Sequence, residues 1–229
     1  MSEADLTMNS AYLHITMNKT IEGSRYTTIP EVDSTPLVAD LTSEILSRKL
    51  DLQRFSMLYA GAQKNLGPAG VTVAIIRENW LEKASKKIPE IMRYETFAKN
   101  KSLYNTPPVH TIYLMNLVLK WVVKQGGVEQ LEHQNSEKSG LIYDVIDASG
   151  GFYQGIIEVN DRSHMNITWR MANEGIERQF IEESEANGFE GLARYRSVGG
   201  LRASAYNAVS YEACQALADF MIDFARRNG

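Results

Sequence analysis

Cysteine is almost absent from the sequence, which holds only Cys214 among its 229 residues. A single cysteine cannot form a disulfide within the chain, so we expect a fold that needs no covalent crosslink. Structural disulfides are typical of oxidising compartments, and their absence makes a reducing, cytoplasmic setting the default expectation. The first residues, MSEADL, are acidic and lack the cationic and apolar regions of a signal peptide, which agrees with that expectation.

Long apolar runs and blocks of one charge are missing as well. Runs such as VTVAII (71–76) are far shorter than the roughly 20 residues of a membrane-spanning helix. Asn116 and Lys120 interrupt the richer stretch YLMNLVLKWVV, and the net charge of −4 is spread along the chain without a basic stripe. We therefore expect a globular protein of one large or two smaller domains, with neither a membrane nor a nucleic acid as partner.

The two common glycine-rich nucleotide motifs do not occur either. The sequence has no GxGxxG, and GAQKNLGPAG (61–70) does not fit GxxxxGK(S/T). This segment instead places Lys64 between glycines, just after the apolar run FSMLYA (55–60). Partial burial there would lower the pKa of the ammonium group and free the amine to attack a carbonyl, so Lys64 is a candidate for Schiff-base chemistry. The alternative is a solvated lysine in a surface loop.

The pattern of apolar residues predicts strands and helices that alternate along the chain. Segments rich in β-branched and aromatic residues indicate strands at 11–17, 36–40, 55–60, 71–77, 151–159 and 164–171. Apolar residues three and four apart indicate helices at 109–124, 128–148, 175–187 and 211–227. This order predicts an α/β fold, and because the first four strands lack strict alternation we expect them to be buried in a sheet covered on both faces. Gln125 to Gly127 mark the expected boundary between two domains.

The carboxylate of Asp40 ends the apolar run PLVAD (36–40). Asp40 is therefore expected at the carboxyl edge of a strand, where open α/β sheets bind their ligands. A protonated pyridine nitrogen would suit this carboxylate, because an adjacent negative charge keeps such a nitrogen cationic and the ring electron-withdrawing. The alternative is an N-cap for a helix that starts near Ser43.

Two further motifs carry polar side chains beside prolines or glycines. In LYNTPP (103–108) the prolines fix a turn that presents Asn105 and Thr106, although such a turn is also common before a helix. RYRSVGGLRAS (194–204) contains three arginines, and arginine binds carboxylate or phosphate through paired hydrogen bonds. Surface charge beside a turn is the alternative for these arginines.

Together these motifs resemble the phosphoserine aminotransferase family, pyridoxal-phosphate enzymes of the aspartate aminotransferase fold type I. The strings that carry the resemblance stand in the family's order: HITMNKTIEG, PLVADLTSEILSR, YAGAQKNLGPAGVTVAIIR, SLYNTPP, GLIYDVID, SHMNITWR and RSVGGLRASAYNAV. They cover nearly the whole chain, which corresponds to the family sequence after about its first third. The resemblance implies that residues 1–125 form part of a cofactor-binding large domain with a mixed, mostly parallel sheet, and that residues 126–229 form a smaller α+β domain.

The resemblance also implies roles for residues around the cofactor. Lys64 would bond covalently to the aldehyde of pyridoxal phosphate, Asp40 would pair with its pyridine nitrogen, and Thr20 would bond its phenolic oxygen. Gln63 would contact the cofactor phosphate. The resemblance thus implies that the lysine between glycines serves cofactor chemistry.

A homodimer and a substrate site follow from the same resemblance. Asn105 and Thr106 would reach the cofactor phosphate of the neighbouring subunit, Arg202 would hold the substrate α-carboxylate, and Arg196 would help to bind the substrate phosphate. The implied reaction converts 3-phosphohydroxypyruvate and glutamate to phosphoserine and 2-oxoglutarate in serine biosynthesis. The alternative is a catalytically silent, truncated homologue that acts as a dimerising or binding module.

Overall fold

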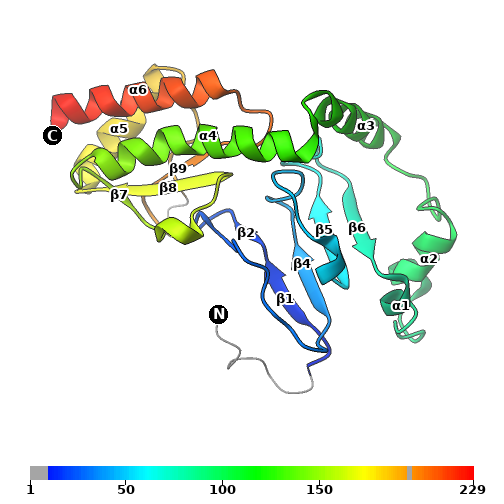
Figure 1. Ribbon diagram of the computed structural model, residues 1–229. Coiled ribbons are helices and arrows are strands. Elements are labelled where there is room, and N and C mark those ends of the chain that lie inside the picture. The colour runs from blue at the N-terminus through cyan, green and yellow to red at the C-terminus, as the bar shows by residue number, and fades with distance from the viewer. Residues whose placement is uncertain (1–9, 195–197) are drawn as a thin grey trace.

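The computed structural model describes residues 10–194 and 198–229, which form two larger sheets flanked by helices (Figure 1). The strands are β1 (Leu13–Thr16), β2 (Asn18–Lys19), β3 (Ser24–Arg25), β4 (Leu37–Asp40), β5 (Met57–Gly61), β6 (Thr72–Ile76), β7 (Tyr153–Gly155), β8 (Asn166–Met171) and β9 (Leu201–Ser204). The helices are α1 (Glu78–Leu81), α2 (Tyr94–Lys99), α3 (Val109–Lys124), α4 (Gly127–Ala148), α5 (Glu174–Ala186) and α6 (Tyr211–Asn228). The expected α/β class is confirmed.

The first sheet has the strand order β1-β4-β5-β6. β1, β4 and β5 are parallel, and β6 pairs antiparallel with β5, so the sheet is mixed and mostly parallel, as expected. The register aligns Thr16 of β1 with Asp40 of β4, and Asp40 with Tyr59 of β5. The carboxyl ends of three neighbouring strands therefore meet at one edge, which is where open α/β sheets place their ligand sites.

β6 departs from the expectation that the first four strands are all buried. Thr72, Ala74 and Ile75 are exposed, and Ile75 retains 46% of its accessible surface. β6 is the last strand of the sheet and pairs on one side only, whereas Leu37, Val38 and Ala39 of the central strand β4 are buried. The prediction of complete burial is wrong at this edge, because missing alternation in a sequence does not distinguish an edge strand from a central one.

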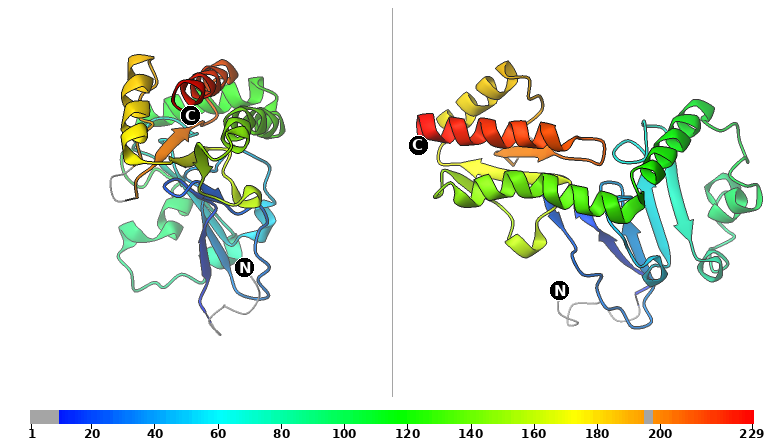
Figure 2. Two further views of the ribbon diagram at one scale, coloured as in Figure 1. Left: turned by 90° about the vertical axis from the view of Figure 1, so that its left-hand side faces the viewer. Right: turned by 45° about the horizontal axis from the view of Figure 1, so that its top comes forward.

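The second sheet is antiparallel, with the order β7-β8-β9, and the long helices α4 and α6 run alongside each other over it (Figure 2). Trp169 of β8 and Phe180 of α5 are fully buried at its centre. Ser210 begins α6 by accepting a hydrogen bond from the Ala213 N–H at 3.2 Å. A side-chain cap of this kind satisfies one of the N–H groups that the first helical turn leaves without a backbone partner.

Each sheet has its own hydrophobic core. The first core gathers residues of β1, β4, β5 and the turns beside them, and includes Ile15, Leu37, Leu58 and Leu66. The second gathers residues of α4, α5, α6 and the antiparallel sheet.

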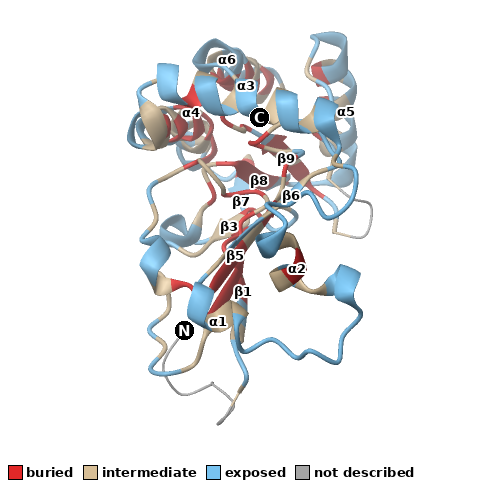
Figure 3. Cartoon of the chain, turned by 90° about the vertical axis from the view of Figure 1, so that its right-hand side faces the viewer, coloured by how far each residue is buried: buried red, intermediate tan, exposed pale blue. Residues whose placement is uncertain are grey.

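The helices α3 and α4 join through a two-glycine turn between these two regions. Gly126 and Gly127 adopt φ values of +95° and +82°, a backbone conformation that favours glycine, so the helical pattern breaks there as the sequence predicts. In α3 only Val122 is buried, and Val109 and Val123 retain 67% and 75% of their accessible surface (Figure 3). Among the described helices, none has the length and apolar character that crossing a bilayer requires.

Candidate active site

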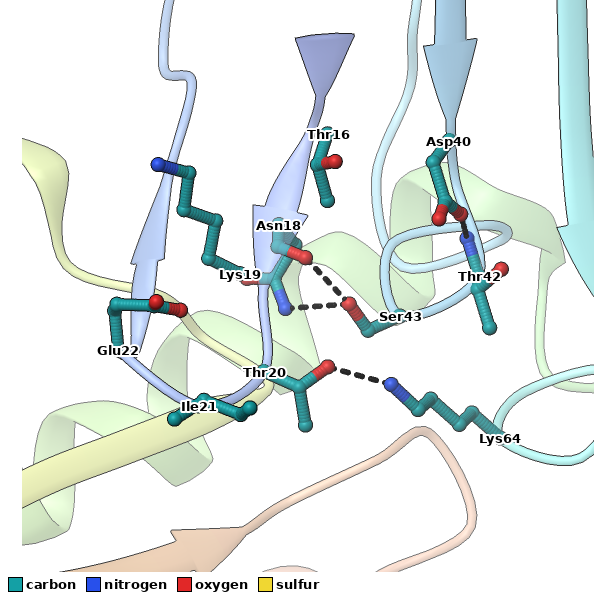
Figure 4. A pocket seen from close by; sticks show the side chains of 10 residues that line it. All are labelled: Thr16, Asn18, Lys19, Thr20, Ile21, Glu22, Asp40, Thr42, Ser43 and Lys64. Atoms are coloured by element: carbon teal, nitrogen blue, oxygen red, sulfur yellow. Dashed lines mark hydrogen bonds between the residues drawn. The ribbon is translucent and has the colours of Figure 1, made fainter. Parts of the chain in front are cut away.

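Three chain segments converge just beyond the carboxyl edge of the first sheet. Thr20 follows β1 and β2, Asp40 ends β4, and Lys64 lies in the turn after β5. All three line one cavity of about 410 Å³, which also contacts Thr16, Asn18, Lys19, Ile21, Glu22, Thr42 and Ser43 (Figure 4). Lys64 and Asp40, which the sequence places at or just after strand ends, therefore lie at the same edge of the sheet.

Lys64 points into this cavity from a tight turn. β5 ends at Gly61, and the N–H groups of Leu66 and Gly67 both bond the Ala62 carbonyl, at 3.1 and 2.9 Å, which folds the chain back on itself. The Lys64 ammonium donates a hydrogen bond to the Thr20 hydroxyl at an Nζ to Oγ1 distance of 2.5 Å. The interpretation of Lys64 as a freely solvated surface residue is therefore wrong.

The surroundings of Lys64 lower the pKa of its ammonium group. Burial lowers the pKa of the Lys64 ammonium below its ordinary value, and the positive charge of Arg202 lowers this pKa further. The Asp40 carboxylate acts in the opposite direction without cancelling the effect of burial. The amine of a lysine attacks carbonyl carbon only in its unprotonated form, so the lowered pKa suits Lys64 for covalent capture of an aldehyde.

Asp40 is held by a turn rather than by a helix. Its Oδ1 accepts a hydrogen bond from the Thr42 N–H at 2.8 Å, and the Thr42 hydroxyl in turn accepts one from the Gly61 N–H at 3.2 Å. Residues 42–47 form turns, so the alternative that Asp40 caps a helix near Ser43 is wrong. Within the described chain the second oxygen, Oδ2, has no hydrogen-bond partner, which leaves one acceptor for a cationic N–H group.

Arg202 brings the second sheet to the same site. It lies on β9, and its Nη1 donates to the Thr20 carbonyl at 3.5 Å, so a cation stands beside the segment that Lys64 also contacts. Tyr206, four residues further on, places its ring centroid 6.0 Å from the Lys64 Nζ. Arg196, the second arginine implied by the resemblance, lies outside the described residues.

The three remaining candidates do not line the Lys64 cavity of their own chain. Gln63 is exposed, and its side chain folds back over Gly61. A Cβ atom added to Gly61 would lie only 2.5 Å from the Gln63 Oε1. Asn105 and Thr106 are exposed in the segment before α3, and the Asn105 amide donates to the Thr106 carbonyl at 3.2 Å.

Several polar residues of the site are not singled out by the sequence motifs. Asn18 is buried and donates to the Ser43 hydroxyl and to the Asn166 Oδ1, both at 2.9 Å, which ties β2 to the turn after β4 and to β8. Thr42 and Ser43 could have been found from their position, because they directly follow Asp40 at the end of a strand. Asn18 carries no such signal, since its partners lie far along the chain.

The donor set at this site suits an organic cofactor. An amine with a lowered pKa, a hydroxyl and a carboxylate with a spare oxygen face one cavity, which fits a heterocycle that carries an aldehyde and a ring nitrogen. The described part of the chain contains no group of three or more His, Cys, Asp or Glu residues that could hold a metal ion.

Comparison with known proteins assigns the chain to one family. Residues 1–217 match the family model of class-V aminotransferases, and the chain therefore belongs to the class-V aminotransferase family. Within this family the chain is 53% identical, over 229 residues, to the phosphoserine aminotransferase of Niallia circulans. That match covers 100% of this chain and 63% of the relative, so the chain spans less than two thirds of the length of the curated relative.

Two solved structures agree with this assignment. The phosphoserine aminotransferase from Bacillus circulans subsp. alkalophilus superposes with a TM-score of 0.95 at 54% identity, covering 98% of this chain and 62% of that one. A phosphoserine aminotransferase from Trichomonas vaginalis, solved with PLP bound, superposes with a TM-score of 0.89 at 34% identity, covering 95% and 61% of the two chains.

Proposed function

We propose that this chain is the catalytic part of a phosphoserine aminotransferase that uses pyridoxal phosphate. The observation that carries the proposal is the contact of the Lys64 amine with the Thr20 hydroxyl at 2.5 Å, in a cavity that the Asp40 carboxylate also lines. An amine, a hydroxyl and a carboxylate in that arrangement match the aldehyde, phenolic oxygen and ring nitrogen of this cofactor. The names of the relatives, and the bound PLP in one of the solved structures, support the same assignment.

Each residue has a defined task toward the cofactor. When bound, pyridoxal phosphate supplies an aldehyde that bonds amines and a ring that withdraws electrons from the bonded carbon. Lys64 would hold the aldehyde carbon, Thr20 would donate to the phenolic oxygen, and Asp40 would keep the ring nitrogen protonated through its free Oδ2. Gln63 would hold the phosphate.

Lys64 also acts as the base of the reaction. Its lowered pKa leaves a larger fraction of neutral amine near neutral pH than an exposed lysine would have. As a free amine, the Nζ atom of Lys64 would accept a proton from one carbon and return it to another. The Thr20 hydroxyl limits where Nζ can lie, and this restriction favours transfer over a short path.

The substrates are assigned by charge. Arg202 presents a cation beside Thr20 for an α-carboxylate, and Arg196 would bind a phosphate group. We propose 3-phosphohydroxypyruvate and glutamate as substrates, and phosphoserine and 2-oxoglutarate as products, as part of serine biosynthesis in the cytoplasm. The single, buried Cys214 is in keeping with a reducing compartment.

The assembly we propose is a homodimer. Asn105 and Thr106 are exposed and precede α3, whose surface is apolar and open at positions such as Val109 and Val123. Buried against a second copy, this helix would place the two polar residues within reach of the neighbouring cofactor phosphate. The alternative of a silent binding module is not favoured by a specific observation, because the relatives carry the name of an enzyme.

The two hydrophobic cores support a further proposal on domain organisation. One core lies within residues 15–66 and the other within residues 142–224, on either side of the glycine turn at Gly126. We propose that residues 1–125 form part of the large cofactor-binding domain and residues 126–229 form the small domain. Limited proteolysis tests this division, since a protease that cuts beside Gly126 should release a fragment that keeps α4 to α6 folded.

A half-reaction tests the enzymatic proposal. The purified chain is loaded with pyridoxal phosphate and mixed with phosphoserine in the absence of an amino acceptor. We expect conversion of the cofactor to pyridoxamine phosphate, seen as loss of its visible absorbance, with release of one equivalent of 3-phosphohydroxypyruvate. Lys64→Ala should abolish the conversion. A chain that binds the cofactor but releases no keto acid from phosphoserine would refute the proposed substrate.

A further inference from the structure

The turn segment that follows β4, residues 42–47, contains a residue in an unusual backbone conformation. Leu46 adopts a φ of +60°, a region that L side chains rarely enter. Three consecutive carbonyls surround this position, and each accepts a hydrogen bond from a different buried asparagine. The pairs are Asn65 Nδ2 to Ile45 O at 3.0 Å, Asn207 Nδ2 to Leu46 O at 2.9 Å, and Asn135 Nδ2 to Ser47 O at 3.0 Å.

These three asparagines, which we call the asparagine cluster, also bond one another. The backbone N–H of Asn207 donates to the Asn65 Oδ1 at 3.1 Å, and the Asn135 amide donates to the Asn207 Oδ1 at 2.9 Å. Their exposed fractions are 5% for Asn65, 1% for Asn135 and 7% for Asn207. Buried amides are costly unless their hydrogen bonds are made. Among the described residues the Asn135 Oδ1 has no partner, but every other side-chain amide atom of the cluster has one, so this network has a narrow range of stable geometries.

The cluster joins the three segments that carry the charged groups of the active site. Asn65 directly follows Lys64, the turn at Leu46 continues the chain from Asp40, and Asn207 lies five residues after Arg202. Lys138 secures the last of these segments from the other side, because its ammonium donates to the carbonyls of Tyr206 at 3.0 Å and Val209 at 2.8 Å.

We propose that the asparagine cluster consists of positioning residues that set the location of the Lys64 amine relative to Asp40 and Arg202. The inference deepens the proposed function, since it assigns to these amides the geometry on which Lys64 depends. Asn65 has the most direct effect, because its side chain fixes the backbone next to Lys64 at two points, the Ile45 carbonyl and the Asn207 N–H.

The test measures the Lys64 amine in the absence of cofactor. The chain is acetylated with a trace of acetic anhydride at a series of pH values, and mass spectrometry of peptides gives the pH midpoint of Lys64 labelling, with the exposed Lys87 as the standard for reagent. In Asn65→Ala the turn is released and the amine becomes better solvated. We expect the Lys64 midpoint to rise by about half a pH unit or more, toward that of an ordinary lysine.

Two matched variants control for a loss of fold. Asn207→Ala keeps the backbone N–H that bonds Asn65 but removes the donor to Leu46 and the acceptor for the Asn135 amide, so its midpoint should rise by a smaller amount than in Asn65→Ala. Ser184→Ala removes an equally buried hydrogen bond, from the Ser184 hydroxyl to the Ile181 carbonyl at 2.8 Å, in the second core, and should leave the midpoint unchanged.

The outcomes separate this inference from the proposed function. A folded Asn65→Ala chain with an unchanged Lys64 midpoint would overturn the positioning role. If Asn65→Ala does not fold, an unchanged midpoint in Asn207→Ala overturns it instead. Because no cofactor is present, a shifted midpoint in a chain that fails the phosphoserine half-reaction would support the positioning role and refute only the proposed function.

Discussion

The regions around Lys64 and Lys138 each hold a lysine whose pKa is lowered by burial, yet they differ in every other respect. Lys138 is 4% exposed, and its ammonium donates to the backbone carbonyls of Ala205, Tyr206 and Val209 at 3.5, 3.0 and 2.8 Å. Its three N–H groups are thus all used within the protein. Lys64 is half-buried, donates to one hydroxyl, and faces a cavity of about 410 Å³.

This difference shows that burial alone does not make a lysine reactive. A lysine whose ammonium is fully hydrogen-bonded to carbonyls stabilises the loop that it contacts, and it has no room for a carbonyl carbon. A lysine with one hydrogen bond and open space beside its amine can lose its proton and form a new bond. The contacts of Lys138 thus make its region rigid, whereas the region around Lys64 leaves an amine able to react.

The largest expected difference between the two lysines is in their contribution to the stability of the fold. Lys138→Met removes the donor to three buried carbonyls, and we expect the free energy of unfolding to fall by about 3 kcal/mol, measured by urea denaturation. Lys64→Met makes the same chemical change at a side chain that has one hydrogen bond and faces a cavity. The free energy of unfolding should therefore fall by less than about 1 kcal/mol. Equal losses in the two variants would contradict the contrast between the regions.

A histidine just before β8, His164, gives a smaller, pH-dependent effect. Burial lowers the pKa of His164 to about 4, and the nearby Arg25 and Arg48 act in the same direction. Its Nε2 accepts a hydrogen bond from the Arg25 guanidinium at 3.1 Å, which requires the neutral ring. Between pH 6.5 and pH 4 the unfolded chain therefore binds more protons than the folded chain, and stability falls as the pH falls.

We expect His164 to account for about 2 kcal/mol of the stability lost between pH 7 and pH 4. His164→Gln should show a correspondingly flatter pH dependence of the urea midpoint. His133→Gln serves as the control, because His133 lies on the exposed surface of α4 with 68% of its side chain accessible. If both variants lose stability with acid as steeply as the unmodified chain, His164 is not the group that titrates.

The charges around Lys64 should move its pKa in opposite directions. Asp40 raises the pKa of the Lys64 ammonium and Arg202 lowers it, against the larger effect of burial. Asp40→Asn is therefore expected to shift the pH midpoint of Lys64 acetylation downward, and Arg202→Met to shift it upward by a smaller amount. Shifts of the same sign in both variants would show that Lys64 responds to loosening of the site rather than to charge.

The smallest effect belongs to a third lysine that links the two regions at the surface. The Lys49 ammonium pairs with the Glu129 carboxylate of α4, and both side chains are more than two thirds exposed, at 73% and 72%. Exposed ion pairs are screened by water and salt, so Lys49→Ala should leave the urea midpoint unchanged within error. A clear loss of stability would mean that this pair holds the regions together more than the buried contacts do.

Much of the fold could be predicted because it depends on local patterns. The helices α3, α4 and α6 repeat apolar residues with the helical period, and their observed bounds lie within a residue or two of those predicted. The sequence does not predict β9, because its four residues follow a glycine pair in an arginine-rich segment that is typical of a turn. The short elements α1, α2, β2 and β3 were missed for the same reason, since so few residues show no period.

The site divides in a similar way. Asp40 and Lys64 could be brought together from the sequence, because parallel strands that end in polar residues place them at one edge of a sheet. The positions of Asn65, Asn135 and Asn207 could not, since their hydrogen bonds connect residues 72 and 142 positions apart in the chain. Such contacts depend on the packing of two sheets, for which a single sequence carries no local signal.

The most direct test of the account is to locate the lysine that captures pyridoxal phosphate. The chain is mixed with one equivalent of the cofactor, reduced with borohydride, digested, and analysed by mass spectrometry. We expect the phosphopyridoxyl group on the peptide that contains Lys64, with none on Lys138 and only traces on exposed lysines such as Lys49. A label spread over exposed lysines, with Lys64 unmodified, would contradict the central claim that this amine is poised to react.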